Sequence, residues 1–378
     1  APSSRLDTQP VNSGPMTVNS PRKHLVLLGA GRAHLQVLRG LARQAASDWS
    51  VSLVAPHPYY IEAGMLPGYV AGHYTLDDIR VPLDGLVQAS GAQFVPAHVL
   101  ALDPAARRVQ LSTGDALPYD VLSIDVEPAA ARDAVEAAMP GARGNAMFMR
   151  PMHAFVQLWP QLQQLAQQRP LQVAVIAERL PGIELAMAAA HALAAPHGSR
   201  VTLVAGAEPL LAELPASLQR RVLARLKALD ITVLQDRCTG IEQGSITLAS
   251  GATLLCDAPL LAHGLDTPGW LAESGLQTAE DGALQLNERL QSDSHRQVFV
   301  VPPGAPAEVG PALEANLRTA LEGGAFRKAP LGAARLHVVG GGHEHAIAVW
   351  GPLGLEGREV WHWKDRRDRK QLAALFAR

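Results

Sequence analysis

The chain has 378 residues, 48% of them apolar and 18% charged, and its formal net charge is −2. This length accommodates two domains with sizeable cores, and the near-neutral charge excludes a protein that attracts nucleic acid over its whole surface. No apolar run approaches the roughly 20 residues that span a bilayer. The two cysteines, Cys238 and Cys256, form neither a disulfide framework nor a Cys-x-x-Cys pair, which suits a reducing, cytoplasmic compartment.

Residues 1–22 are rich in Ser, Pro, Asn and Thr and poor in apolar side chains. They lack the apolar centre of a signal peptide. We therefore expect a disordered tail or a cloning remnant, with Met16 as the natural start.

A strand, a glycine turn and a helix are predicted from His24 to Leu38. An apolar run leads into Gly29-Ala30-Gly31, and a second strand, Val51 to Val54, follows about one helix length later. This order is typical of a βαβ unit whose glycines let the main chain approach a pyrophosphate at the helix N-terminus. His34 stands at the third glycine position, and Ala55-Pro56 replaces the acid that would bind a ribose. The plainer alternative is a tight turn between a strand and a helix.

The same unit recurs between Leu171 and Val204, with its glycine turn largely lost. Ala177, Glu178 and Arg179 occupy the glycine stretch, and Gly182 remains. Side chains would crowd a pyrophosphate there, and the Glu178 carboxylate would repel it. The pattern indicates a duplicated chain that evolved to hold two dinucleotides.

The duplication extends beyond the glycine turns, because each βαβ unit is followed by a β-ribbon and a final apolar strand (107–124 and 245–261). We expect an α/β fold with two Rossmann-like dinucleotide-binding domains and a C-terminal extension. The expected domains are residues 23–140 with 282–326, residues 141–281, and an extension of residues 327–378.

The extension has a different pattern, with two short strands, 336–339 and 346–350, and a basic helix over 358–378. The turn between the strands contains His343-Glu344-His345, a spacing too short for a helical zinc pair, so no metal site is predicted. Trp361 and Trp363 among basic residues fit a helix at a membrane surface. They equally fit a helix whose tryptophans pack on the protein body.

Three segments together resemble a known family: the first glycine turn, the segment Gly64 to Gly68, and the ending from Trp350 to Arg369. From Lys23 onward the chain resembles the pyridine nucleotide-disulfide oxidoreductase superfamily. Within it, the chain is most similar to flavoproteins related to type II NADH dehydrogenases and sulfide:quinone reductases, including the flavoprotein domain fused to selenide, water dikinase.

The resemblance implies FAD in the first domain, a nicotinamide nucleotide in the second, and electron transfer from a small-molecule donor to a quinone-like acceptor. It also implies contact of the C-terminal helix with the inner face of a membrane, and it leaves a homodimer open. Glu184 matches the acid after the second glycine turn and is the residue we expect to act as a polar contact or proton relay. The cofactor-binding residues that the resemblance implies are Gly29, Ala30, Gly31 and His34 at the FAD pyrophosphate, Gly64, Met65, Leu66 and Pro67 beside the flavin, and Gly264 in the second strand-end turn.

Several positions depart from the family pattern. Ile124 to Pro128 replaces the first Thr-Gly turn, no acid follows Val204, and Pro302-Pro303 stands where the family has Gly-Asp at the flavin. We therefore expect NAD(P)H binding of the usual kind to be lost. The leading hypothesis is an FAD-dependent oxidoreductase, and the alternative is a non-catalytic relative that has lost its cofactors and acts as a binding or partner module. A flavoprotein reduced by a protein or thiol partner is a third option.

Overall fold

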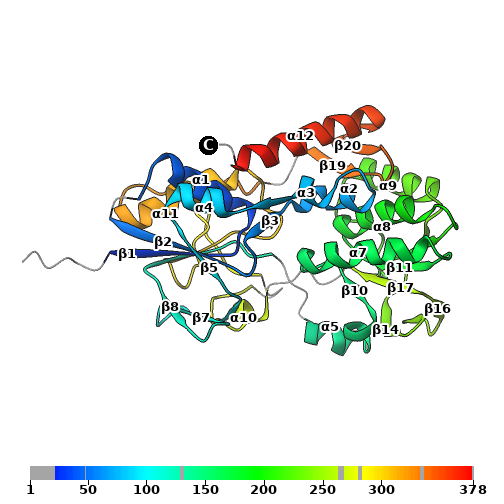
Figure 1. Ribbon diagram of the computed structural model, residues 1–378, viewed down its shortest axis with the longest axis horizontal. Helices are drawn as coiled ribbons and strands as arrows, with labels where there is room; N and C mark the ends of the chain where they lie inside the picture. Colours follow the sequence, from blue (N-terminus) through cyan, green and yellow to red (C-terminus); the bar gives the residue numbers. More distant parts are fainter. Residues whose placement is uncertain are drawn as a thin grey trace, which may run out of the picture.

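The computed structural model describes residues 22–46, 48–127, 132–262, 268–279, 283–332 and 336–376. Two lobes lie side by side, and helix α12 (Arg358–Phe376) lies across both of them (Figure 1). The N-terminal tail and the predicted site residue Gly264 lie outside the described residues. Among the helices that the structure describes, none combines the length and the apolar content needed to cross a bilayer.

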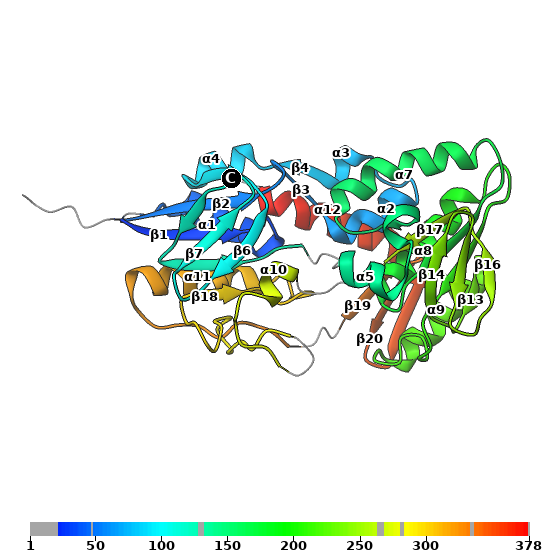
Figure 2. The same cartoon turned by 90° about the horizontal axis from the view of Figure 1, so that it is seen from below.

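The first lobe is built on a parallel five-stranded sheet in the order β18-β9-β1-β2-β5. On one face α1 packs between α4 and α11 and contacts both, and the antiparallel sheet β6-β7-β8 covers the other face (Figure 2). The buried stretch of β1 is fully apolar, and that of β9 is apolar except for Ser123, as expected for a sheet covered on both faces. The bounds are β1 Lys23–Leu28, α1 Arg32–Arg43, β2 Trp49–Ala55, β3 Tyr59–Ile61, η1 Ala63–Met65, α2 Leu66–Val70, α3 Leu76–Ile79, β4 Arg80–Pro82, α4 Asp84–Ser90, β5 Gln93–Pro96, β6 Val99–Asp103, β7 Arg108–Leu111, β8 Ala116–Pro118, β9 Val121–Ile124, α10 Gly269–Ala272, β18 Val298–Val300 and α11 Val309–Glu322.

The second lobe repeats the design with a parallel sheet in the order β10-β17-β11-β12-β13 and an antiparallel sheet β14-β15-β16. Its central pair, β11 and β12, flanks the eroded glycine turn. The bounds are α5 Arg132–Ala138, α6 Ala142–Asn145, β10 Met147–Phe148, α7 Met152–Ala166, β11 Gln172–Ile176, α8 Leu180–Leu193, β12 Arg200–Val204, α9 Ala216–Ala228, β13 Thr232–Leu234, β14 Cys238–Glu242, β15 Ser245–Leu248, β16 Thr253–Leu255 and β17 Ala258–Leu261.

The chain passes from one lobe to the other twice, near the predicted boundaries at residues 140 and 281, and at both places the predicted boundary assigns residues to the wrong lobe. Val135 and Met139 pack in a core of the second lobe with Val204, although the prediction placed them in the first domain. Leu271 and Leu276 pack in the first lobe against its central sheet, although the prediction placed them in the second. These segments contain only the short helices α5 and α10 and the loops beside them, too short for a clear periodic pattern, so only packing reveals which core they join.

The C-terminal extension forms a three-stranded antiparallel sheet and then α12. Its strands are β19 Leu336–Gly340, β20 Ala346–Trp350 and β21 Leu353–Gly357. The sequence predicted the first two strands and the helix; β21 was missed because its glycines weaken the strand pattern. The sheet packs on α8 and α9, whereas α12 reaches α1 of the other lobe.

Candidate nucleotide sites

The first glycine turn lies at the carboxyl edge of the first sheet, where ligands of open parallel sheets bind. Gly29 has φ +88°, and its N–H donates to the carbonyl of Val54 at 2.8 Å. A Cβ at Gly29 would lie less than 3.0 Å from the main chain of Asp125. Both the positive φ and the close approach therefore require glycine. The turn places the N-terminus of α1 at the carboxyl ends of β1 and β9, the two strands between which the strand order reverses.

His34 lies beneath this turn and not at its open side. Its ring is fully buried, with Nδ1 2.7 Å from the Gly29 carbonyl and Nε2 2.8 Å from Ser123 Oγ. Because a carbonyl only accepts, Nδ1 donates and Nε2 accepts from the serine hydroxyl. Burial lowers the pKa of His34, which keeps the ring neutral. The His34 side chain therefore does not face a ligand at the turn, and only its backbone N–H is placed to contact a pyrophosphate.

Two acids that replace the Thr-Gly turn after β9 bind the first turns of two helices. The Asp125 carboxylate accepts the N–H of His34 at 3.1 Å, at the start of α1. The Glu127 carboxylate accepts the N–H of Met152 at 2.9 Å, at the start of α7, and pairs with Arg150 at 2.6 Å. Helix N-termini favour such negative charge. The sequence showed only that these residues follow a buried strand.

The peptide from Gly64 to Pro67 forms η1 and the start of α2, next to the start of α1. It is held by the buried Glu62, whose carboxylate accepts from Gly64 N–H and from the Tyr60 hydroxyl, each at 3.1 Å. Arg32, the first residue of α1, lies 3.4 Å from the same carboxylate. Burial and the Glu62 charge raise the pKa of Tyr60 well above its usual value, so the phenol remains a donor. The structure thus brings the predicted turn and the predicted flavin-side peptide together.

Helix α12 covers this junction from the C-terminal end of the chain. Lys364 donates to the Gly64 carbonyl at 3.2 Å and pairs with Asp368 at 2.5 Å. Arg369 pairs with Asp78 of α3 at 3.0 Å. Trp361 packs against the ring of His73, with centroids 4.9 Å apart, whereas the side chain of Trp363 is 41% exposed. One tryptophan therefore packs on the body and the other faces outward.

Glu184 lies on α8, close to this covered junction. Its Oε1 accepts the N–H of Gly340 at 2.6 Å and so ties α8 to β19. Burial raises the pKa of Glu184 to about 7, which the nearby charge of Lys364 opposes in part. A carboxyl that titrates near neutral pH can hold or release a proton. Its place beside Lys364, which itself contacts Gly64, keeps Glu184 a candidate for proton transfer.

The raised pKa predicts a pH-dependent stability. A carboxyl whose pKa is higher in the folded than in the unfolded state loses its stabilising contribution as pH rises from about 4.5 to about 7. Glu184→Gln keeps an acceptor for Gly340 and removes the titration. We expect the variant to match the wild type at pH 5 and to exceed its unfolding free energy at pH 8 by at most about 3 kcal/mol. Urea unfolding at both pH values measures this.

The control for this experiment is Glu359→Gln, at an exposed position in the first turn of α12. This control should leave the pH dependence of unfolding unchanged. A Glu184→Gln curve parallel to the wild type from pH 5 to pH 8 would contradict the assignment.

The second βαβ unit does not keep an anion site at the start of its helix. Pro181 in the first turn of α8 has no N–H, and no side chain caps Arg179 at the N-cap. Gly182 packs on Ala177, where a Cβ would overlap. The Glu178 carboxylate lies beside Gly206, 2.7 Å from where its Cβ would be. Glu178 and Gly206 line a cavity of about 290 Å³. With a carboxylate in this position and no N–H at Pro181, the second site does not fit a nicotinamide dinucleotide.

The remaining candidates from the sequence show no reactive arrangement. Cys238 and Cys256 are buried and unpaired, and burial raises the pKa of Cys256 to about 11, so the thiolate is disfavoured at neutral pH. Across the described ranges, no three His, Cys, Asp or Glu side chains gather as metal ligands would. The sequence did not single out His57, after β2, whose ring centroid lies 3.8 Å from that of His153.

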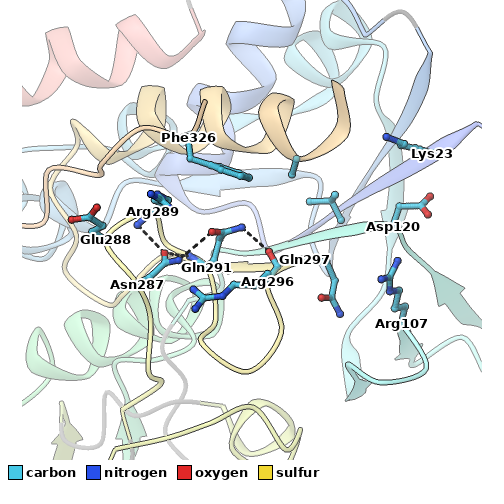
Figure 3. A pocket seen from close by; sticks show the side chains of 12 residues that line it. Lys23, Arg107, Asp120, Asn287, Glu288, Arg289, Gln291, Arg296, Gln297 and Phe326 are labelled. Carbon is cyan, nitrogen blue, oxygen red and sulfur yellow. Dashed lines mark hydrogen bonds between the residues drawn. The ribbon is translucent and has the colours of Figure 1, made fainter. Parts of the chain in front are cut away.

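A wide depression of about 910 Å³ lies at the opposite, amino edge of the first sheet. Lys23 and Arg107 line one side of it and Arg289 and Phe326 the other (Figure 3). Parallel sheets bind nucleotides at their carboxyl edge, so this depression is not the expected site.

The family match settles the identity of this architecture. The family model described as pyridine nucleotide-disulphide oxidoreductase matches residues 23–313. The chain belongs to the pyridine nucleotide-disulphide oxidoreductase family. It is therefore a member of a family of oxidoreductase enzymes, and the predicted family and α/β fold are confirmed.

Individual relatives agree with this membership. A type II NADH:quinone oxidoreductase of Staphylococcus saprophyticus is 31% identical over 106 residues, which are 28% of this chain and 26% of the relative. A sulfide-quinone reductase of Aquifex aeolicus is 28% identical over 106 residues, 28% and 24% of the two chains. The match thus spans about a quarter of the length of these curated relatives.

Solved structures show the same fold over almost the whole chain. The sulfide:quinone oxidoreductase of Aquifex aeolicus aligns with a TM-score of 0.75 at 17% identity, covering 94% of this chain and 91% of that one. The NDH2 of Plasmodium falciparum, solved with NADH, aligns with a TM-score of 0.74 at 12% identity, covering 94% and 98%.

The family implies a flavin and a nicotinamide nucleotide, and the two sites of this chain differ in how well they fit. At the first site, the glycine turn, the start of α1 and the Gly64–Pro67 peptide are in place. The His34 N–H at the start of α1 donates to a carboxylate oxygen of Asp125, so this helix end interacts favourably with negative charge. The first site therefore fits FAD in its main chain, whereas the second site does not fit a nicotinamide nucleotide.

Proposed function

We propose that this chain is an FAD-dependent oxidoreductase that passes electrons from a small donor other than NAD(P)H to a quinone-like acceptor. The observation that carries the proposal is the first glycine turn, with Gly29 at φ +88°, which aims α1 at a junction closed by the Gly64–Pro67 peptide and α12. In the proposal, Gly29, Ala30 and Gly31 hold the FAD pyrophosphate. Gly64, Met65, Leu66 and Pro67 flank the flavin.

When bound, FAD supplies the two-electron chemistry, and the protein supplies orientation and electrostatics. Lys364 donates to the Gly64 carbonyl and, although paired with Asp368, orients an N–H donor toward the flavin-side peptide. Glu184 holds or releases a proton near neutral pH. Helix α12 lies across the junction and would limit the access of water to a bound flavin.

The donor and the acceptor are argued from different observations. Pro181 and Glu178 at the second glycine turn argue against NAD(P)H and leave a thiol, a sulfur compound or a protein as the donor. The quinone-like acceptor is supported by relatives whose names include NADH:quinone oxidoreductase and sulfide-quinone reductase. Exposed Trp363 and the basic residues of α12 support a peripheral position at the inner face of a membrane.

We expect purified protein to show the absorption bands of oxidised flavin, with FAD released on heating. We also expect NADH or NADPH under anaerobic conditions to leave the flavin oxidised, because the second turn repels a pyrophosphate. A thiol or sulfide donor should reduce the flavin and bleach its absorption. A soluble quinone added afterwards should reoxidise the flavin and restore the bands.

Three results decide between the candidates. Protein that stays colourless after incubation with excess FAD would favour the cofactor-free relative that the Pro302-Pro303 departure suggests. Rapid bleaching by NADH would overturn the donor assignment. Bleaching by a thiol and recovery with a quinone analogue would support the proposal in full.

A further inference from the structure

The carboxylate of Asp125 lies over the second glycine of the first turn, the position at which a dinucleotide fold receives a pyrophosphate. The carboxylate of Asp125, at the end of β9, fills the space above Gly31, where a Cβ would lie less than 3.0 Å from all three of its carboxylate atoms. One of its oxygens accepts the His34 N–H at 3.1 Å. A dinucleotide fold keeps this space open with a glycine so that the phosphate can reach the helix. Here glycine is present, and the space is taken by the protein's own anion.

The main chain around Asp125 cannot move aside to clear the space. The Asp125 N–H donates to the Leu28 carbonyl at 2.9 Å, and its carbonyl accepts the Gly31 N–H at 3.1 Å. Both ends of this residue are thus tied to the glycine turn. Only rotation of the side chain can withdraw the carboxylate, and that rotation breaks its bond to His34.

We propose that Asp125 acts as an internal competitor of the FAD pyrophosphate and sets how tightly the first domain holds FAD. This inference rests on the proposed function, because it presumes that FAD is the ligand of this site. Binding requires the carboxylate to leave the α1 N-terminus, and the displaced charge still lies close to two phosphate charges of the same sign. The repulsion between the displaced Asp125 carboxylate and the FAD phosphates, a few ångströms apart, is large enough to weaken FAD binding at least about tenfold.

A second role for Asp125 is that of a helix cap, and the two roles predict opposite effects. A cap stabilises the protein without ligand, and its loss would loosen the site and weaken FAD binding. A competitor weakens binding, so that its loss strengthens FAD binding. Asn caps helices as well as Asp does, so Asp125→Asn removes the charge and keeps the cap.

The test is a titration of FAD into flavin-free full-length protein, followed by quenching of flavin fluorescence. The variants are Asp125→Asn and Asp125→Ala. The matched control is Asp120→Asn, because Asp120 immediately precedes the same strand at the opposite edge of the sheet and accepts the His24 N–H at 2.7 Å. Thermal unfolding without FAD is the second readout, and ADP serves as a second probe that carries the pyrophosphate without the flavin.

We expect Asp125→Asn to lower the dissociation constants for FAD and ADP by about tenfold or more, with no change for Asp120→Asn. Asp125→Ala should bind at least as tightly as the asparagine variant while unfolding about 2 °C lower without ligand. Equal dissociation constants for wild type and Asp125→Asn would overturn the inference. Binding of FAD by none of the proteins would overturn both this inference and the proposed function. A wild type that does not bind and an Asp125→Asn variant that does would support the inference alone.

Discussion

Gly29→Ala is expected to lower the free energy of unfolding by about 3 kcal/mol or more. An L-residue at φ +88° carries about 1–2 kcal/mol of strain. The added methyl group would also lie less than 3.0 Å from the carbonyl of Asp125 and from Val126 Cα. These are main-chain atoms held by the strands, so the sheet edge itself would have to shift.

The control is Gly114→Ala, in the turn between β7 and β8. Gly114 has a similar φ of +92°, but no atom lies within 4 Å of where its Cβ would be. It should lose only the conformational part, about 1 kcal/mol. Urea unfolding of both variants separates strain from overlap. Equal losses would show that the turn relaxes and that the close approach at Gly29 contributes nothing.

His34→Ala should destabilise the protein by about 3–4 kcal/mol. The substitution leaves the Gly29 carbonyl and the Ser123 hydroxyl buried without their partner, and it creates a cavity under the turn. The effect depends on pH, because burial lowers the pKa of His34 in the folded protein. As pH falls below about 6.5, the His34 imidazole becomes protonated in the unfolded chain but stays neutral in the folded protein, so the folded state loses stability. The advantage of the wild type should therefore shrink between pH 7.5 and pH 5.

His24→Ala is a matched control at the amino edge of the same sheet. The His24 ring also bridges a carbonyl, that of Pro118 at 2.9 Å, and a hydroxyl, that of Ser52 at 2.8 Å. Its side chain is only partly buried, so water can replace these bonds, and the loss should be about 1 kcal/mol. A His34→Ala variant as stable as His24→Ala would contradict the role of His34 as a buried link between β1 and β9.

The two candidate nucleotide sites share one kind of departure from the family pattern. In each, a carboxylate lies at or beside the glycine turn: Asp125 at the first and Glu178 at the second. They differ in the helix that follows, because α1 keeps its N–H groups whereas α8 has Pro181 in its first turn. At the first site, rotation of the Asp125 side chain would free the start of α1 for a phosphate. At the second site no such movement helps, because Pro181 has no N–H to donate.

Local patterns in the sequence predicted both βαβ units. The apolar runs of β1 and β11 and the helices after them were found because a buried strand and an amphipathic helix have different periods. The family resemblance rested on the first glycine turn, the segment Gly64 to Gly68 and the ending from Trp350 to Arg369, and the family was confirmed. The Gly64–Pro67 peptide was predicted to lie beside the flavin by resemblance alone. The structure brings it next to the glycine turn through Arg32 and Glu62.

The sequence by itself determined the duplicated α/β fold, the order of its strands along the chain, and the loss of glycines at the second turn, because each is recorded in neighbouring residues. Only the tertiary structure decided what lies at the first turn. The Asp125 carboxylate and the His34 N–H are 91 positions apart, and Lys364 and Gly64 are 300 apart. Such contacts follow from how strands and helices pack against each other, and no local period encodes them. For that reason His34 was predicted to lie at the ligand and lies under the turn, whereas Asp125, read only as a departure from a family motif, lies at the centre of the site.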